Sequence, residues 1–487
     1  MMQTSRPNIV LVLADDMGYG DVGCYGAEKI PTPHMDRLAA RGVRFTDAHS
    51  SSSVCTPSRY SVLTGRYCWR SRLHMGVLSG HSPPLIEPGR PTIASFLQDQ
   101  GYRTACVGKW HLGLGWQDGD GNPLAQSSAD PDSQWWKGRA ADYARGFDGG
   151  PIELGFDYYF GMPASLDIPP YCYLEGRHCA GIPSLRKTQF YPGQQEGFIA
   201  ENFHEEEVDV TFTRKAVNFL EGRAETESES PFFLYLATSA PHRPCAPPGF
   251  IRNRSTAGKR GDLVCLVDWA VGEIADTLER LGVLDNTLFI VTSDNGALPG
   301  DVDHVTHGHH SCGPWRGTKA DIWEGGHRIP LIAAWPGHVP PGQVRSEPVC
   351  LTDLFSTLAG LLQAPLPPES AEDSFDISPL LTQSRPSAPP RSSVIHHSYD
   401  GMFALRRETW KLIEGLGSGG FTPPRRDTPQ NDGPEGQLYE LGRDPHEDDN
   451  LWLRHPGIVR DLQEDLNRQR TRPATRPRTA PETTEKK

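Results

Sequence analysis

The chain has 487 residues and a formal net charge of −13, with 48 Lys and Arg against 61 Asp and Glu. The length predicts two domains, and the acidic balance argues against nucleic acid as the main partner. No apolar run is long enough to predict a membrane span. The ten cysteines include no Cys-X-X-Cys pair of the metal-binding type, and a disulfide framework is not predicted for a chain of this size. Cys172 and Cys179 are near enough in sequence to pair, and the reduced state is the alternative.

The first predicted strand begins close to the start of the chain, and residues 1–7 lack the apolar run of a signal peptide. The sequence as it stands therefore predicts a cytoplasmic protein. A periplasmic or secreted location is the alternative if the N-terminus is truncated or wrongly assigned.

Continuous apolar runs followed by polar residues predict three strands that are buried on both faces. The runs span residues 8–14, 232–237 and 288–292. The polar residues behind them are Asp15 and Asp16, His242, and Asp294 and Asn295. Helices are predicted over residues 35–41, 92–100, 206–223 and 262–281. Strands that alternate with helices predict an α/β fold with a mostly parallel sheet, which binds its ligands beyond the carboxyl ends of the strands.

The rest of the chain predicts a second, smaller domain. Residues 1–375 form the predicted catalytic domain, with an insertion at about 113–205 that faces the substrate entrance. Residues 376–470 form the predicted C-terminal α+β subdomain with an antiparallel sheet. Its strands are expected at 403–406, 410–413 and 437–441 and its closing helix at 456–468. The polar segment 471–487 is predicted to be disordered.

One short motif combines a cysteine with a proline, a serine and an arginine. It reads Cys55-Thr56-Pro57-Ser58-Arg59 and is followed by Leu63-Thr64-Gly65-Arg66. Pro57 suits the first turn of a helix, and Arg59, one turn on, can face Cys55 or a bound anion. Cys55 is then either a reactive thiol at a helix N-terminus or a buried structural cysteine.

The acidic pairs Asp15-Asp16 and Asp294-Asn295 are candidate metal ligands. Three carboxylates and one amide suit a hard divalent cation, Ca²⁺ or Mg²⁺, better than zinc. The alternative is that the two pairs form helix caps or turns.

Three further segments carry candidate catalytic side chains. They are Gly108-Lys109-Trp110-His111-Leu112-Gly113, Pro241-His242-Arg243-Pro244 and Arg316-Gly317-Thr318-Lys319. Each segment taken alone also fits an ordinary exposed loop. A histidine-rich stretch at 304–310 is either a zinc site or a loop that lines the substrate entrance.

Together these motifs resemble the signatures of the type I, formylglycine-dependent sulfatases of the alkaline phosphatase superfamily. The resemblance runs from residue 7 to about residue 455, and it is strongest to the arylsulfatase A and N-acetylgalactosamine-6-sulfatase types. It implies an alkaline-phosphatase-like sheet sandwiched by helices. It also implies that Cys55 is oxidised to Cα-formylglycine by a formylglycine-generating or an anaerobic sulfatase-maturating enzyme.

The resemblance also implies roles for the candidate side chains. One divalent cation, commonly Ca²⁺, is bound by Asp15, Asp16, Asp294, Asn295 and the formylglycine oxygen at Cys55. Arg59, Lys109 and Lys319 neutralise the sulfate, and the formylglycine hydrate attacks its sulfur. His111 acts as a base, and His242 or Lys319 protonates the leaving oxygen.

The implied activity is hydrolysis of sulfate monoesters, with a sulfated carbohydrate favoured over an aryl sulfate. Aromatic residues can stack on sugar rings or simply pack the loops; they are Trp135, Trp136, Tyr158, Tyr159 and Trp315. One alternative is a phosphonate or phosphate monoester hydrolase on the same fold. The other is a non-catalytic binder of sulfated glycans, which follows if Cys55 stays unmodified.

Overall fold

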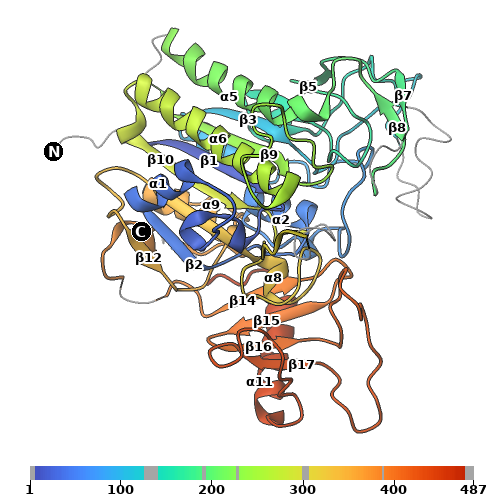
Figure 1. The fold of residues 1–487 in the computed structure, drawn as a ribbon, viewed down its shortest axis with the longest axis vertical. Helices are drawn as coiled ribbons and strands as arrows, with labels where there is room; N and C mark the ends of the chain where they lie inside the picture. The colour runs from blue at the N-terminus through green and yellow to red at the C-terminus, as the bar shows by residue number, and fades with distance from the viewer. Residues whose placement is uncertain are drawn as a thin grey trace, which may run out of the picture.

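The fold has a large lobe built on one long sheet and a small lobe built on another (Figure 1). The structure is a computed structural model, and it describes residues 6–124, 141–188, 193–225, 230–298, 306–386 and 389–477. The small lobe projects from the large one as the orange and red part of the ribbon.

The large sheet has eleven strands, and three predicted strands lie at its centre. β1 (Asn8–Asp15) runs parallel to β10 (Thr287–Ser293) on one side and to β9 (Phe232–Pro241) on the other. Every residue of these three strands is buried, as their continuous apolar runs predicted. β3 (Arg103–Lys109) pairs in parallel with β9 and was not predicted. The outer strands are β2 (Val43–His49), β4 (Tyr158–Met162), β5 (Leu174–Glu175), β6 (His178–Cys179), β11 (Arg328–Ala334), β12 (Gln343–Arg345) and β13 (Val349–Cys350).

Two groups of helices flank this sheet. α5 (Val208–Glu225) and α6 (Gly258–Arg280) pack on each other and on β9, and α1 (Pro33–Arg41) packs on α6. α2 (Cys55–Thr64) packs on α3 (Ile93–Asp99) and α9 (Leu354–Leu361). The four predicted helices are therefore confirmed with shifted ends, and the mostly parallel α/β fold is confirmed with them. The shorter helices are α8 (Glu324–His327), α10 (Ser378–Thr382), η1 (Tyr19–Asp21), η2 (Gly23–Tyr25), η3 (Cys68–Arg70), η4 (Pro151–Leu154), η5 (Glu205–Glu207), η6 (Leu284–Asn286) and η7 (Leu351–Asp353).

Part of segment 113–205 belongs to the core, which differs from the predicted insertion. β4 pairs in parallel with β3, and β5 and β6 continue the sheet beyond it. Only the hairpin β7 (Leu185–Lys187) and β8 (Gly197–Ile199) forms a separate sheet among the described residues of the segment. Tyr159 is fully buried in β4, and Tyr158 stacks on Phe219 at 6.2 Å between ring centroids. Both tyrosines therefore pack the protein, while Trp135 and Trp136 lie outside the described residues.

The small lobe is an antiparallel sheet closed by α11 (Pro456–Thr471). Its strands are β14 (Ser393–His397), β15 (Phe403–Arg407), β16 (Trp410–Ile413) and β17 (Gln437–Glu440), of which only β14 was not predicted. α10 packs on α9 of the large lobe, so the small sheet begins at Ser393, later than the predicted boundary at residue 376.

The predicted disordered tail is partly ordered. The Thr475 amide donates to Asp373 Oδ1 at 3.1 Å, and Arg476 Nε donates to the Ala371 carbonyl at 2.9 Å. These contacts fix the chain just beyond α11 on the large lobe, and residues 478–487 lie outside the described residues.

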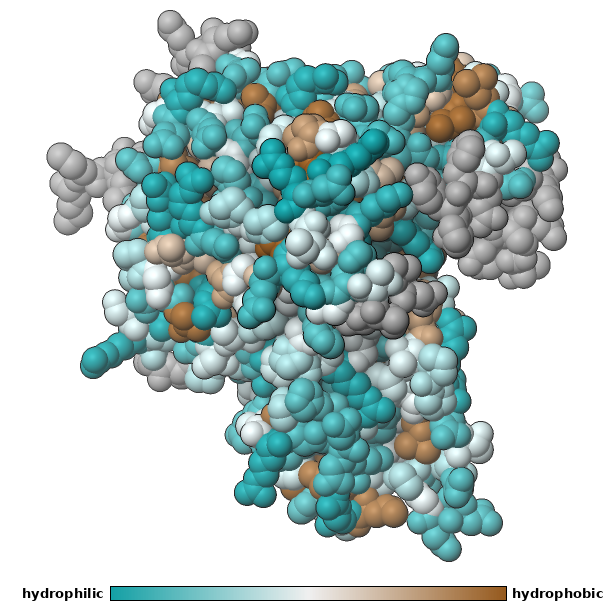
Figure 2. Space-filling model, in the orientation of Figure 1, coloured by the Kyte–Doolittle hydropathy of each residue, from teal (hydrophilic) through white to brown (hydrophobic). Residues whose placement is uncertain are grey.

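Hydrophilic residues predominate on the face seen in Figure 2, and the hydrophobic ones are scattered in small groups. None of the described helices combines the length and the apolar character that crossing a bilayer requires.

Candidate active site

The candidate site forms where four neighbouring parallel strands end. β10, β1, β9 and β3 are adjacent in the sheet in that order. Their carboxyl ends carry Asp294 and Asn295, Asp15 and Asp16, His242, and Lys109. Parallel strands bring these ends to one edge, as the fold rule predicts. Three of the four strand ends were predicted, and the fourth came with the unpredicted strand β3.

Cys55 is the first residue of α2 and is 2% exposed. Its Sγ lies 3.4 Å from Asp15 Oδ1 and 3.2 Å from Lys319 Nζ. Burial raises the pKa of the Cys55 thiol, despite the opposing charges of Lys109 and Lys319. A thiolate is therefore disfavoured here, which argues against the reactive-thiol interpretation.

Two buried lysines neutralise two of the carboxylates. Lys109 Nζ donates to Asp15 Oδ2 at 2.6 Å, and Lys319 Nζ donates to Asp16 Oδ2 at 2.8 Å. Burial opposes ionisation of Asp15, but the charge of Lys109 and other nearby cations holds the pKa of that carboxyl well below its usual range. Asp16 has a left-handed backbone (φ 67°), and its amide donates to Asp294 Oδ1 at 3.1 Å. The predicted ligands thus contact one another across neighbouring strands.

The oxygen donors of this cluster fit a hard divalent cation. Ligand atoms of Asp15, Asp16, Cys55 and His242 all lie within 4.8 Å of one another. Asn295 donates its Nδ2 to Asp16 Oδ1 at 2.7 Å, and its Oδ1 is buried with no hydrogen-bond partner among the described residues. Carboxylates and an unused amide oxygen are the donor set that Ca²⁺ or Mg²⁺ prefers.

Arg59 forms a buried ion pair with Asp294, one of the carboxylates of the cluster. Its side chain is fully buried, with Nε and Nη2 donating to Asp294 Oδ2 at 2.9 and 2.7 Å. Its Nη1 donates to the Lys109 carbonyl at 3.1 Å. Arg59 therefore fixes Asp294 and the end of β3. The sequence had instead suggested that Arg59 contacts Cys55 or a bound anion.

Each of the two candidate histidines has one ring nitrogen in contact with a backbone carbonyl. His111 Nε2 is 2.8 Å from the Leu78 carbonyl, and its buried Nδ1 has no hydrogen-bond partner among the described residues. Burial, with the charge of Lys109, holds the pKa of His111 well below its usual range, so the ring is neutral. His242 Nδ1 is 2.6 Å from the Arg243 carbonyl, and its Nε2 lies 3.6 Å from Asp16 Oδ2.

Sequence reasoning missed a buried support behind Asp16. Arg260 Nη2 donates to the Asp16 carbonyl at 2.8 Å and to Asp21 Oδ2 at 2.6 Å. His309 Nε2 lies 2.9 Å from Asp21 Oδ1. No motif surrounds Arg260, because its partners are about 240 positions away in the chain.

The histidine-rich stretch supplies no metal cluster within the part of the chain that is described, and His304 lies outside it. Trp315 is half-buried, and the Arg328 guanidinium lies 3.9 Å from its ring centroid. One face of the indole ring is therefore covered by Arg328. Arg328 also pairs with Glu324 at 2.9 Å, so its guanidinium contacts both an aromatic ring and a carboxylate.

The fold and the site define an α/β protein in which buried lysines and a carboxylate cluster that could hold a cation surround one cysteine, an arrangement suited to an anionic ester. The Sulfatase family model matches residues 7–364. The chain therefore belongs to the sulfatase family and is a sulfuric ester hydrolase.

Its relatives include enzymes that act on sugars and enzymes named for aryl sulfates. An N-acetylgalactosamine-6-O-sulfatase of Bacteroides thetaiotaomicron is 34% identical over 95% of this chain and 92% of its own. Human arylsulfatase A is 34% identical over 91% of this chain and 83% of its own. A solved structure from work on glycosaminoglycan metabolism by Bacteroides thetaiotaomicron has a TM-score of 0.83 at 32% identity and covers 96% of this chain and 100% of its own.

Proposed function

We propose that this sulfatase removes sulfate from a sulfated carbohydrate, with Cys55 as the precursor of a formylglycine and with one divalent cation. The observation that carries the proposal is the placement of Cys55, buried between Asp15 and Lys319 with a disfavoured thiolate. A carbohydrate is favoured because the bacterial relative named for N-acetylgalactosamine 6-sulfate matches along nearly the whole chain. An aryl sulfate is the second candidate, supported by the match to arylsulfatase A.

Asp15, Asp16, Asp294 and Asn295, with an oxygen at position 55, would hold the cation. We propose Ca²⁺, with Mg²⁺ as the alternative. When bound, the cation supplies positive charge to the sulfate oxygens and acidifies the attacking hydroxyl.

The formylglycine hydrate at position 55 supplies one hydroxyl to attack sulfur and a second that allows sulfate to be eliminated. Lys109 and Lys319 lie beside that position and would bind sulfate oxygens, while Arg59 keeps Asp294 in place. His111 Nδ1 is the free base that accepts the proton of the remaining hydroxyl. His242 Nε2 or Lys319 Nζ supplies the proton to the leaving oxygen.

Mass spectrometry of the tryptic peptide that contains Cys55 tests the modification. Protein co-produced with a formylglycine-generating enzyme is expected to carry an aldehyde in place of the thiol and to release sulfate. Cys55→Ala should abolish turnover and leave the fold intact, as circular dichroism measures. An unmodified cysteine in active protein would overturn the proposed nucleophile, and unmodified, inactive protein that binds sulfated glycans would favour the binder.

Chelation tests the cation with a readout besides activity. Removing divalent ions should lower the unfolding temperature, because the cluster keeps three buried carboxylates together, and Ca²⁺ should restore it more fully than Mg²⁺. Asp294→Asn should weaken that Ca²⁺ response. An unfolding temperature that does not change with either ion contradicts the proposed site. Matched sulfate and phosphonate esters then separate a sulfatase from a phosphonate hydrolase by their relative rates.

A further inference from the structure

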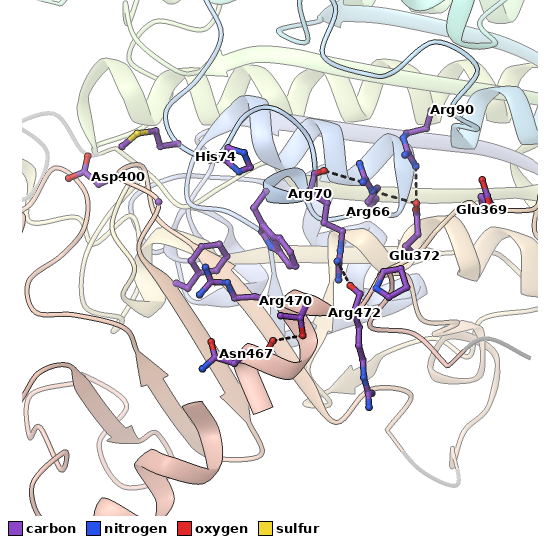
Figure 3. Close-up of a pocket in the computed structure, with 16 residues that line it drawn as sticks. Arg66, Arg70, His74, Arg90, Glu369, Glu372, Asp400, Asn467, Arg470 and Arg472 are labelled. Atoms are coloured by element: carbon purple, nitrogen blue, oxygen red, sulfur yellow. Dashed lines mark hydrogen bonds and ion pairs between the residues drawn. The ribbon is translucent and has the colours of Figure 1, made fainter. Parts of the chain in front are cut away.

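A polar groove of about 1050 Å³ lies between the two lobes (Figure 3), and none of the candidate catalytic or metal-binding side chains lines it. Its walls come from the segment after α2, from the end of α11 and from the loop before β15. Five arginines and three acidic residues line it, namely Arg66, Arg70, Arg90, Arg470 and Arg472 with Glu369, Glu372 and Asp400. An excess of cationic side chains is notable in a chain whose net charge is −13.

The inner arginines build the wall. Arg90 Nη1 pairs with Glu372 Oε1 at 3.0 Å, and Arg70 Nε pairs with Asp373 Oδ2 at 2.9 Å. Arg70 Nη1 also donates to the Arg472 carbonyl at 2.5 Å, as the dashed line in Figure 3 shows. These contacts fix the backbone of Arg472 and leave its guanidinium for another partner.

The outer arginines supply the accessible positive charge. The Arg472 side chain is exposed, and no carboxylate among the described residues lies within ion-pair distance of it. Arg470 pairs with Glu414 at 2.9 Å, yet 36% of its side chain is exposed, and its guanidinium lies 4.1 Å from the Phe403 ring centroid. A rim of this kind attracts an anionic chain and leaves no bare aromatic face for a nucleic acid base.

One end of the groove adjoins the reaction centre along the chain. His74 lines the groove, and four residues on, the Leu78 carbonyl is held by His111. Four residues span at most about 14 Å. Asp400 lies at the same end as His74 (Figure 3), and the Tyr399 amide donates to the carbonyl of Ala320, next to Lys319, at 3.0 Å.

We infer that this groove binds a stretch of an anionic polysaccharide whose sulfated sugar occupies the reaction centre. The inference rests on the proposed carbohydrate substrate and extends it from a single sugar to a polymer. The sulfate or carboxylate groups of the chain contact Arg470 and Arg472. Its hydroxyls find donors and acceptors in polar residues such as Asn467 and Asp400.

Binding of chondroitin 6-sulfate to the Cys55→Ala protein, measured by calorimetry at low ionic strength, tests the groove without turnover. Arg470→Gln/Arg472→Gln should weaken binding about five- to twenty-fold, since exposed charge contacts are individually modest. Arg443→Gln is the matched control, because this arginine is 92% exposed and lies outside the groove. Desulfated chondroitin keeps the carboxylates and lacks the sulfates, so its affinity shows which of the two anions is recognised.

Arg472→Gln alone provides a second variant that leaves the packing of Phe403 intact. Equal affinities of both groove variants and the Arg443→Gln control would overturn the inference. Loss of the effect at about 1 M salt is expected for the groove, because exposed charges are screened there. A protein that binds the polymer through the groove but releases no sulfate would contradict the proposed function and leave the groove in place.

Discussion

At the scale of single residues, the contact of His111 with a backbone carbonyl suits the proton transfer that we propose for it. The Leu78 carbonyl holds Nε2, so that nitrogen carries the proton and the neutral ring keeps a lone pair on Nδ1. His111 has a left-handed backbone (φ 56°) and lies two residues beyond Lys109, the last residue of β3. The proposed base and the proposed anion-binding ammonium therefore lie within three consecutive residues.

His111→Gln tests the proposed base, because it removes the basic nitrogen and keeps the hydrogen bond to Leu78. The glutamine amide can still donate to the Leu78 carbonyl, but it has no basic nitrogen. We expect kcat to fall about 10²- to 10⁴-fold with KM changed only slightly, because proton transfer is lost and binding is kept. Steady-state kinetics on an aryl sulfate measure this. His338→Gln, at a ring that stacks on Trp335, is the control, and a loss of less than about tenfold in His111→Gln would contradict the role.

At the scale of elements, α5 and β9 are joined by one buried carboxylate. Asp209 lies in the first turn of α5 and accepts from the amide and the hydroxyl of Ser239, at 2.8 and 2.7 Å. Ser239 precedes His242 by three residues, so this contact fixes the turn that presents the histidine. Burial raises the pKa of Asp209 to about 6, against the hydrogen bonds from Ser239.

The contribution of Asp209 to the free energy of unfolding should fall as the pH rises from about 4 to about 6. The unfolded carboxyl has a pKa of about 3.9, so the native state binds the proton more tightly between about pH 4 and 6. The shift of about two units corresponds to roughly 3 kcal/mol of unfolding free energy lost by neutral pH. Asp209→Asn cannot titrate, so between about pH 4 and pH 7 its free energy of unfolding, measured with urea, should change by roughly 3 kcal/mol more in the stabilising direction than that of the unchanged protein. An identical pH dependence would refute the assignment.

The elements that were predicted share a local signal, and those that were missed do not. β1, β9 and β10 are continuous apolar runs, which identify a strand buried on both faces. β3 mixes Arg103, Thr104, Cys106 and Gly108 with Val107 as its one larger apolar residue, so no apolar run marks it. The residues of the site were found through their motifs. The Arg59 contact with Asp294 was not, because it joins positions 235 residues apart.

At the scale of the whole molecule, the two lobes are joined by buried ion pairs. Lys411 of β16 is fully buried, and its Nζ lies 3.0 Å from Glu324 Oε1 and 2.8 Å from Glu447 Oε1. Glu324 belongs to α8 of the large lobe, whose segment also carries Lys319. Burial raises the pKa of Glu447 to about 7, against the charge of Lys411. The attachment of the small lobe therefore depends on charges that water does not reach.

Lys411→Met tests that attachment. The change leaves Glu447 buried without its cation, while Glu324 keeps its pair with Arg328. We expect the free energy of unfolding to fall by about 3–5 kcal/mol at neutral pH. The cost should shrink as the pH is lowered, because protonation of Glu447 removes the unpaired charge. Arg454→Gln is the control, since its partner Asp449 is 63% exposed and such exposed pairs contribute little to stability. Urea unfolding measures both variants, and equal losses would show that the buried pair does not hold the lobes together. Adding Glu447→Gln to Lys411→Met should recover part of the stability, because one buried charge is removed with its partner.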